Sequence, residues 1–327
     1  MPIRTRRFVL QAAAANAVLT LQPQWVSAQS ATQLSIGTGG TGGVYYPLGG
    51  GIAALISKNL PGVTATAEAT AAAVDNLKLL HSGEVGLGIC GSDIAAEAQQ
   101  GQLRGLKAHV EVRTLASIYS NFLHIVTTEA SGIRTVLDLK GRRVSTGTPG
   151  SAADVKAQRV LDVSGLTLKD LRSQDRLSAV ESVNAIKDGK IEAFFWNGGL
   201  PTGAILDLGV TPGMKMKLIP HSDVVAKMAA KYGPYYFTGI IPKGTYGGMT
   251  EDVPVVAETH ALVAHARMPE DLAYQITKLL FDKRAELIAV HSAASELTLE
   301  GAVKGSAVPF HAGAIKYYKE RGVAVPA

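Results

Sequence analysis

The sequence predicts an α/β protein that is built from two similar lobes. Strand and helix patterns alternate along the chain, a helix–glycine–strand unit occurs twice, and a glycine-rich loop with hydroxyl side chains precedes a helix twice. Strands that alternate with helices form parallel sheets through right-handed crossovers. The loops that follow such strands gather at one edge of each sheet, where ligands bind.

The first predicted lobe begins with a βαβαβ pattern. Strand patterns occur at 34–36, 63–67 and 85–90, and helical patterns occur at 48–60 and 74–81. The first helix stops at Pro61 and the second ends at Ser82-Gly83, and both kinds of residue commonly follow helices. Two further strands, 114–119 and 123–127, are expected to lead toward the second lobe.

The second lobe repeats the pattern of the first. Residues 74–90 align without gaps on residues 180–196, and in each copy an amphipathic helix ends at a glycine before a buried strand. Residues 37–41 pair with residues 147–151, and the two offsets are close, 106 and 110 residues. Helix–glycine–strand units are common in α/β proteins, but two units in the same order favour a structural repeat.

The end of the chain returns to strand and helix patterns. Residues 237–242 and 253–263 read as extended, and 271–291 reads as one long helix. We therefore expect lobe 1 to comprise residues 29–128 and 245–327 and lobe 2 to comprise residues 129–244. Lobes joined by several crossings of the chain can close around a ligand by hinge motion.

The first 28 residues read as a secretory signal peptide. Arg4, Arg6 and Arg7 form a basic start, an apolar stretch follows, and Val26-Ser27-Ala28 supplies a small-x-small cleavage site. The segment 5–10 also resembles a twin-arginine signal. We expect export to the periplasm with cleavage near Ala28, the alternative being an uncleaved anchor, for which the apolar stretch is short.

Composition excludes several classes of protein. The net charge is +5, and removing the three leader arginines lowers it to about +2, so we expect no nucleic-acid partner. With 46% hydrophobic residues the chain can bury a core, and no later segment is long and apolar enough to be embedded in a membrane. The single cysteine, Cys90, lies in an apolar strand and excludes an intrachain disulfide framework.

The loop at residues 37–46 is the strongest candidate for a ligand site. Glycines let the backbone approach a ligand closely, and free amides at the start of a helix bind carboxylate or phosphate. The candidate contacts are Gly40, Thr41, Gly42, Gly43 and Tyr45, with the hydroxyl of Thr38 as a further donor. A flexible turn is the alternative interpretation.

The same loop contains the G-x-G-x-x-G pattern of dinucleotide-binding folds, as Gly37, Gly39 and Gly42. Glu68 ends the next strand, where such a fold places its ribose-binding acid. Two features weaken this rival: the loop runs on to Pro47 before the predicted helix, and Glu68 stands 31 residues after Gly37. An exported NAD(P)-dependent oxidoreductase stays an alternative.

A second loop of the same kind lies in the predicted second lobe. Its candidate contacts are Pro149, Gly150, Ser151 and Ala152, and two such loops that face each other would hold one anion from both sides. Three further candidates follow the matching buried strands, namely Ser92, Trp196 and Gly199. Ser92 fits a helix N-cap equally well, and Trp196 fits the core equally well.

Signatures of catalysis and of metal binding are absent from the sequence. No nucleophile elbow, Walker loop, Cys-x-x-Cys or His-Glu-x-x-His motif occurs. His260 and His265 are close in sequence, but their spacing on a strand points them to opposite faces. We therefore expect no catalytic residue, no metal ligand and no cofactor.

At these loops the sequence resembles the TAXI family, the extracytoplasmic solute receptors of TRAP transporters, over essentially the whole mature chain. The segments that carry the resemblance are 37–49, 74–90 with Asn76, 138–144, 147–151 and 309–320. The resemblance implies a type II periplasmic-binding-protein fold and the membrane subunits of a TRAP transporter as partner. It also implies ligands such as glutamate, 2-oxoglutarate or related carboxylates.

One loop departs from the family pattern. The family has Thr-Gly-Gly-Ser after the second strand, whereas this chain has Thr70-Ala71-Ala72-Ala73. If Ala71 contacts the ligand, the pocket there is tighter and less polar. This weakens the expectation that glutamate itself is the ligand. The sequence thus predicts a periplasmic receptor for a small carboxylate, and a receptor for a membrane sensor kinase is a further alternative.

Overall fold

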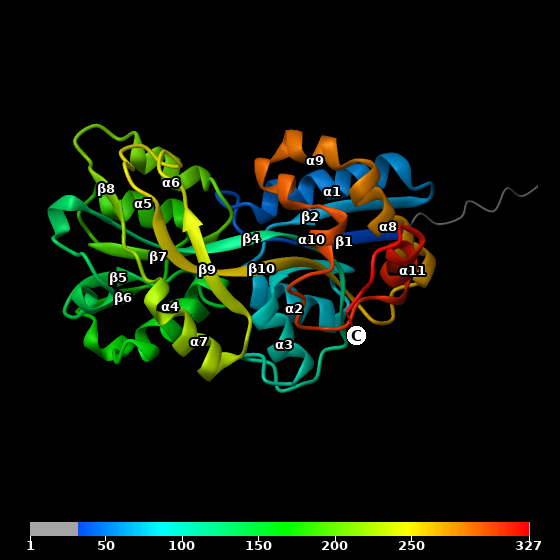
Figure 1. Ribbon diagram of the computed structural model, residues 1–327, viewed down its shortest axis with the longest axis horizontal. Coiled ribbons are helices and arrows are strands. Elements are labelled where there is room, and N and C mark those ends of the chain that lie inside the picture. Colours follow the sequence, from blue (N-terminus) through cyan, green and yellow to red (C-terminus); the bar gives the residue numbers. More distant parts are fainter. Residues whose placement is uncertain (1–31, 327) are drawn as a thin grey trace, which may run out of the picture. The chain divides into compact units, whose positions relative to one another are not determined.

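The computed structural model describes residues 32–326, and these residues form one ten-stranded sheet flanked by helices (Figure 1). The strand order is β2-β1-β3-β10-β4-β7-β5-β6, with β8 beside β4 and β9 beside β10. The strands are β1 (Thr32–Gly37), β2 (Val63–Glu68), β3 (Leu87–Gly91), β4 (Val112–Thr128), β5 (Arg143–Ser145), β6 (Ser173–Asp175), β7 (Ala193–Gly198), β8 (Met216–Leu218), β9 (Tyr236–Ile241) and β10 (Val253–His265). The predicted signal peptide, including its twin-arginine segment and cleavage site, lies outside the described residues.

The predicted repeat is present in the topology. What we call the first half comprises β1–β3 with α1 (Tyr45–Asn59), α2 (Ala73–Ser82) and α3 (Ser92–Gln99). The second half comprises β5–β7 with α4 (Ala152–Val163) and α5 (Ala179–Lys187). Parallel pairing gives the order β2-β1-β3 in the first half and β6-β5-β7 in the second, so each half is a βαβαβ unit.

Two long strands join the halves (Figure 1). Residues 112–128 form the single strand β4, so the prediction of two strands there is wrong. β4 pairs antiparallel with β10 along its first part and with β7 along its last part, and β10 also pairs with β3. The chain therefore crosses between the halves in extended conformation beside the loops that follow the parallel strands.

The helix α1 begins earlier than the sequence predicted. It starts at Tyr45 rather than Leu48, three residues after Gly42, and Pro47 lies within its first turn. A proline is tolerated there because its missing N–H would have no acceptor within the helix. The loop between β1 and α1 is therefore shorter than predicted, so its length argues less strongly against a dinucleotide-binding turn.

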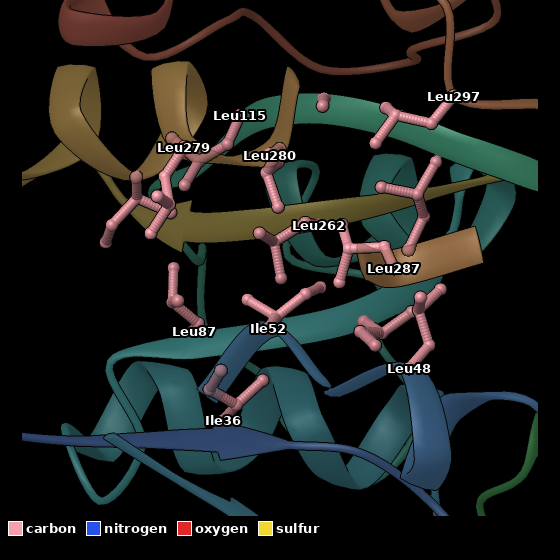
Figure 2. Close-up of a cluster of buried hydrophobic side chains, with 14 of the residues drawn as sticks. Ile36, Leu48, Ile52, Leu87, Leu115, Leu262, Leu279, Leu280, Leu287 and Leu297 are labelled. Carbon is pink, nitrogen blue, oxygen red and sulfur yellow. The ribbon is translucent and has the colours of Figure 1, made fainter. Parts of the chain in front are cut away.

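The C-terminal helices return to the first half and complete its core. The predicted helix at 271–291 is two helices, α8 (Glu270–Asp282) and α9 (Arg284–Val290), which meet at Lys283. Figure 2 shows their leucines packed on side chains from the first half and from the joining strands, with Ile36, Leu48, Ile52, Leu87, Leu115 and Leu262 among the buried residues. Burial of such apolar side chains stabilises the platform that carries α1 and the loop before it.

The remaining helices are α6 (Gly203–Gly209), α7 (Val225–Tyr232), α10 (Leu299–Ala302) and α11 (Ala312–Glu320). None of the helices between residues 32 and 326 is long and apolar enough to cross a membrane.

Candidate functional site

A cavity of about 640 Å³ lies where the loops after the parallel strands of both halves meet. Its wall is formed by the loops that follow β1, β2, β5 and β6, by the end of β7 and by the middle of β4. A volume of this size suits a small organic molecule. The cavity thus stands at the edge of the sheet that the sequence predicted.

Three helices begin at the wall of this cavity. They are α1, α4 and α5, and the first residues of each, Tyr45, Ala152 and Ala179, all line it. The first N–H groups of a helix have no acceptor within the helix, and the helix dipole adds partial positive charge there. The cavity therefore offers several backbone donors to an anion.

Serine caps add side-chain donors at two of these helix starts. The Oγ of Ser151 accepts a hydrogen bond from the backbone N–H of Asp154 (3.1 Å), and the Oγ of Ser178 accepts one from that of Glu181 (3.3 Å). A serine hydroxyl that accepts such a bond keeps its own hydrogen free to donate. Both serines line the cavity, so their hydroxyl groups are available as donors to a ligand there.

The residues that line the cavity carry almost no formal charge. Lysine and arginine are absent from the lining among residues 32–326, and Glu181 is its one ionisable carboxylate. Glu181 accepts a hydrogen bond from the backbone N–H of Ser178 (2.8 Å), which lowers its pKa. Any anion in the cavity would thus be held by backbone amides and hydroxyl groups instead of by a cationic side chain.

Most of the candidate site residues line the cavity. They are Gly40, Thr41, Gly42, Gly43, Tyr45, Ala71, Pro149, Ser151, Ala152 and Trp196. The cavity also includes positions that sequence reasoning missed, namely Tyr119 and Asn121 on β4 and residues 178–181 at the start of α5. A serine three residues before a glutamate signals the start of α5, whereas the two β4 positions carry no local signal.

Ser92 lies apart from the cavity lining. Its buried hydroxyl donates to the backbone oxygens of Thr259 (3.0 Å) and Gly305 (2.5 Å), so it neither faces the cavity nor caps α3, whose N-cap is Gly91. The hydroxyl of Thr38 is likewise occupied, because it donates to the backbone oxygen of Glu68 (2.5 Å). Backbone carbonyls brought close by the fold satisfy both hydroxyl groups.

Gly150 and Gly199 stand behind the wall rather than in it. The oxygen of Gly150 accepts from the N–H of Val74 (3.1 Å), which ties the loop before α4 to the start of α2. Gly199 packs so closely on the ring of Tyr119 that an added Cβ would lie 2.8 Å from it. Gly199 thus packs on Tyr119, which lines the cavity, and Gly150 anchors the loop that carries the lining residues Pro149 and Ser151.

Trp196 reaches across the cavity to the glycine loop of the first half. An added Cβ on Gly43 would lie 2.9 Å from the Trp196 ring, and one on Gly42 would lie 2.7 Å from Val180. The indole Nε1 of Trp196 donates to Thr202 (2.9 Å), which fixes the ring. The glycines are therefore required for the close approach of the two halves, and Trp196 lies at the cavity rather than wholly in the core.

Ala72 has a backbone conformation that side chains rarely adopt. Its φ is 76° and its ψ is −146°, and it is the one residue other than glycine with positive φ in the described chain. Such a conformation is nearly confined to glycine and stores of the order of 1–3 kcal/mol. Ala72 lines the cavity. Because residues 71–73 are alanines where the family pattern has glycines and a serine, a methyl group stands on a strained backbone at the cavity wall.

A network of buried charges lies beneath the cavity and links the halves. Lys156 on α4 contacts Asp93 on α3 (3.1 Å) and Glu258 on β10 (2.5 Å), and all three side chains are almost fully buried. Arg159 also pairs with Asp93 (2.5 Å). Burial alone would raise the pKa of Asp93, but the two cations hold it well below its usual value. Asp93 is therefore a structural anion and not a ligand contact.

The network reaches the cavity through His260. The ring accepts from or donates to Tyr45, Asn121 and Glu258, and His260 itself is fully buried. Burial raises the pKa of Tyr45 well above its usual value, so its hydroxyl stays protonated. His260 thus has a structural role, and among residues 32–326 no cluster of His, Cys, Asp and Glu has an arrangement that would hold a metal ion.

The sequence model of the NMT1-like family matches residues 36–322, which is most of the chain. The chain belongs to this family. The match extends from β1 to the end of α11, so the cavity of this NMT1-like protein lies entirely within the matched region.

Solved structures establish the fold of this family member. An ancestral arginine-binding protein bound to arginine is 14% identical, with a TM-score of 0.50 over 82% of this chain and 98% of that chain. A putative L-cystine ABC transporter from Listeria monocytogenes is 13% identical, with a TM-score of 0.50 over 82% of this chain and 98% of that chain. A Bordetella bronchiseptica RB50 protein is 14% identical, with a TM-score of 0.50 over 90% of this chain and 99% of that chain. The NMT1-like chain has the type II periplasmic-binding-protein fold.

Proposed function

We propose that this protein is a periplasmic solute receptor that binds a small carboxylate in the cavity between its halves and delivers it to a membrane transporter. The observation that carries the proposal is the convergence of the N-termini of α1, α4 and α5 on a cavity that lacks lysine and arginine. Neutral dipoles bind an anion without a permanent counter-charge, which suits a receptor that must also release it. We assign no catalysis to this site.

Hinge closure is the proposed mechanism. The proposed lobes are residues 29–128 with 245–327 and residues 129–244, and β4 and β10 would bend between them. The contact of Gly43 with Trp196 and the hydrogen bond from Val74 to Gly150 both cross between the halves, as expected for a closed form. A ligand that bridges the lobes would favour this form over an open one.

The membrane subunits of a TRAP transporter are the proposed partner. This part of the proposal is supported by the resemblance of the glycine loop, the 74–90 unit and the 309–320 tail to TAXI receptors. Export to the periplasm is supported by the basic leader with its Arg6-Arg7 pair.

Calorimetry with the mature protein tests the proposal. We expect at least one small carboxylate to bind and to raise the melting temperature, because a ligand that binds only the folded state stabilises it. Stabilisation by NAD or NADP with no response to any carboxylate would contradict the proposal and favour the oxidoreductase alternative.

A serine substitution connects binding to the helix starts. Ser151→Gly removes the hydroxyl donor but keeps an acceptable N-cap, so it should cost only a few tenths of a kcal/mol of stability. Loss of a hydrogen bond to a charged ligand should weaken binding about tenfold or more. Thr298→Gly is the matched control, because Thr298 caps α10 through Gly301 (3.0 Å) and does not line the cavity.

A further inference from the structure

The hydrogen-bond donors of the cavity wall gather at the starts of helices. They are the backbone N–H groups in the first turns of α1, α4 and α5 and the hydroxyl groups of the loops before these helices, on Thr41, Thr148, Ser151 and Ser178. Apolar side chains from both halves form much of the remaining wall, among them Ala71, Ala72, Pro149, Val180 and Trp196. The cavity therefore offers hydrogen bonds at the helix starts and apolar surface over much of the rest.

The aromatic side chains of the lining present carbon atoms to the cavity. The hydroxyl of Tyr45 forms a hydrogen bond with the buried ring of His260, and the hydroxyl of Tyr119 is itself buried. The indole Nε1 of Trp196 donates to Thr202 (2.9 Å). The polar atoms of these three aromatic residues are thus either occupied or out of a ligand's reach.

The polar side chains on the strands and on the loop after β2 are not available to a ligand either. The hydroxyl of Thr70 donates to Oδ1 of Asn76 (2.6 Å). The amide oxygens of Asn121 and Asn197 are buried, and their nitrogen atoms bond within the network beneath the cavity. A polar group on the ligand beyond the helix starts would therefore lose its hydration without gaining a partner, which is costly.

The charges around the cavity favour a ligand with one carboxylate. The start of α5 already has an anion, because Glu181 accepts from the N–H of Ser178 (2.8 Å). In contrast, α1 has no acid in its first turn, and the acid in the first turn of α4, Asp154, is paired with Arg176 (2.7 Å). One carboxylate fits between the starts of α1 and α4. A second would find no lysine or arginine in the lining formed by residues 32–326, and Glu181 would repel it.

We infer that the ligand is a monocarboxylate with an apolar body, either an aromatic ring or an alkyl chain, which packs on Val180, Trp196 and Ala72. This inference rests on the proposed function. The cavity volume of about 640 Å³ lies within the range of about 300–1,000 Å³ that holds drug-sized molecules. An ammonium group would have only the exposed carboxylate of Glu181 as a partner in the described lining, and exposed ion pairs contribute little.

Calorimetry with matched acids tests this inference on the unmodified mature protein. The panel comprises the unbranched monocarboxylates of two to six carbons, 4-methylpentanoate, phenylacetate, glutarate and glutamate. We expect the affinity to rise about fourfold for each methylene group that the cavity buries, and phenylacetate to bind at least tenfold more tightly than acetate. Glutarate and glutamate should bind at least tenfold more weakly than pentanoate, which has the same number of carbons. Comparison of phenylacetate with 4-methylpentanoate identifies which apolar body is preferred.

Tryptophan fluorescence locates the apolar body of the ligand. The chain has two tryptophans, and Trp25 belongs to the predicted leader, so Trp196 is the only tryptophan of the mature protein. An apolar body that packs on this ring displaces water from it and should shift its emission to shorter wavelength, whereas acetate should not. Tight binding of phenylacetate with unchanged emission would overturn the assigned contact with Trp196.

A valine substitution tests the wall itself. Val180→Thr replaces a methyl group of the lining with a hydroxyl group of similar size, and Val180 is 46% exposed, so folding should not change. We expect roughly three- to tenfold weaker binding of hexanoate and less than a twofold change for acetate. Val210→Thr is the matched control, because Val210 is exposed and does not line the cavity. Equal effects on both acids, or none on hexanoate, would overturn the contact of the apolar body with Val180.

The outcomes distinguish the inference from the proposal on which it rests. Equal or tighter binding of glutarate or glutamate than of pentanoate and phenylacetate overturns the apolar monocarboxylate but leaves the carboxylate receptor intact. Binding of none of the acids overturns the proposed function and the inference with it.

Discussion

Adding one methyl group to Gly43 tests whether the two halves must approach as closely as the structure shows. An alanine Cβ at this position would lie 2.9 and 3.1 Å from two atoms of the Trp196 ring, about 0.5 Å inside ordinary contact. The ring cannot turn away freely because its Nε1 donates to Thr202. Overpacking of this kind costs about 1–3 kcal/mol. Since the contact crosses between the halves, we expect Gly43→Ala to weaken ligand binding by roughly 5- to 150-fold in calorimetry.

Gly50 provides the matched control for this prediction. It lies in α1 and does not line the cavity, and an alanine Cβ there would meet no atom within 4 Å. Gly50→Ala should bind ligand within twofold of the unmodified protein, and the double variant Gly43→Ala with Trp196→Phe should recover much of the lost affinity. Equal affinities of Gly43→Ala and Gly50→Ala would contradict this prediction, because the contact between the halves would then contribute nothing to binding.

Three further predictions concern stability, each measured by urea unfolding. Ala72→Gly should raise the free energy of unfolding by about 1 kcal/mol by relieving positive φ, while Ala71→Gly should not raise it. Burial lowers the pKa of His124 and of His221 from 6.5 to about 4. The contribution of each neutral histidine to the free energy of unfolding is therefore complete above pH 6.5. It is lost as the pH falls toward 4, by about 1.4 kcal/mol per pH unit for each histidine. His124→Gln should remove the part of this pH dependence that comes from His124. An unchanged dependence of the free energy of unfolding on pH would contradict the lowered pKa of His124. Lys156→Met should cost about 3–5 kcal/mol, because it leaves the buried carboxylate of Glu258 without its lysine partner and Asp93 with Arg159 alone. A loss under about 1 kcal/mol would show that Lys156 is dispensable for stability.

Local patterns in the sequence predicted the parts of the fold that depend on local physics. The alternation of helices and strands, the glycine after each amphipathic helix and the hydroxyl-bearing loops before α1 and α4 are all confirmed by the structure. Because parallel strands bring the following loops to one edge, these signals also predicted most of the cavity wall. The break at Lys283 was missed because no glycine or proline marks it.

Features that depend on the order of strands in the sheet could not be predicted from local sequence patterns. Asn121 lies in the middle of β4, and only the placement of β4 between β10 and β7 brings it beside Asn197. The pairing of Lys156 with Asp93 and Glu258 joins three distant segments in the same way. Ser92 shows the opposite error, since its hydroxyl bonds to the oxygen of Gly305, far along the chain, and so lies away from the cavity.

A crystal structure of the mature protein with the tightest-binding carboxylate would show directly whether the helix starts hold the anionic group. We expect the ligand to lie in the 640 Å³ cavity, with its carboxylate oxygens within hydrogen-bond distance of backbone N–H groups at the starts of at least two of the helices α1, α4 and α5. A ligand bound elsewhere, or one whose carboxylate is held by a lysine or arginine away from these helix starts, would contradict it.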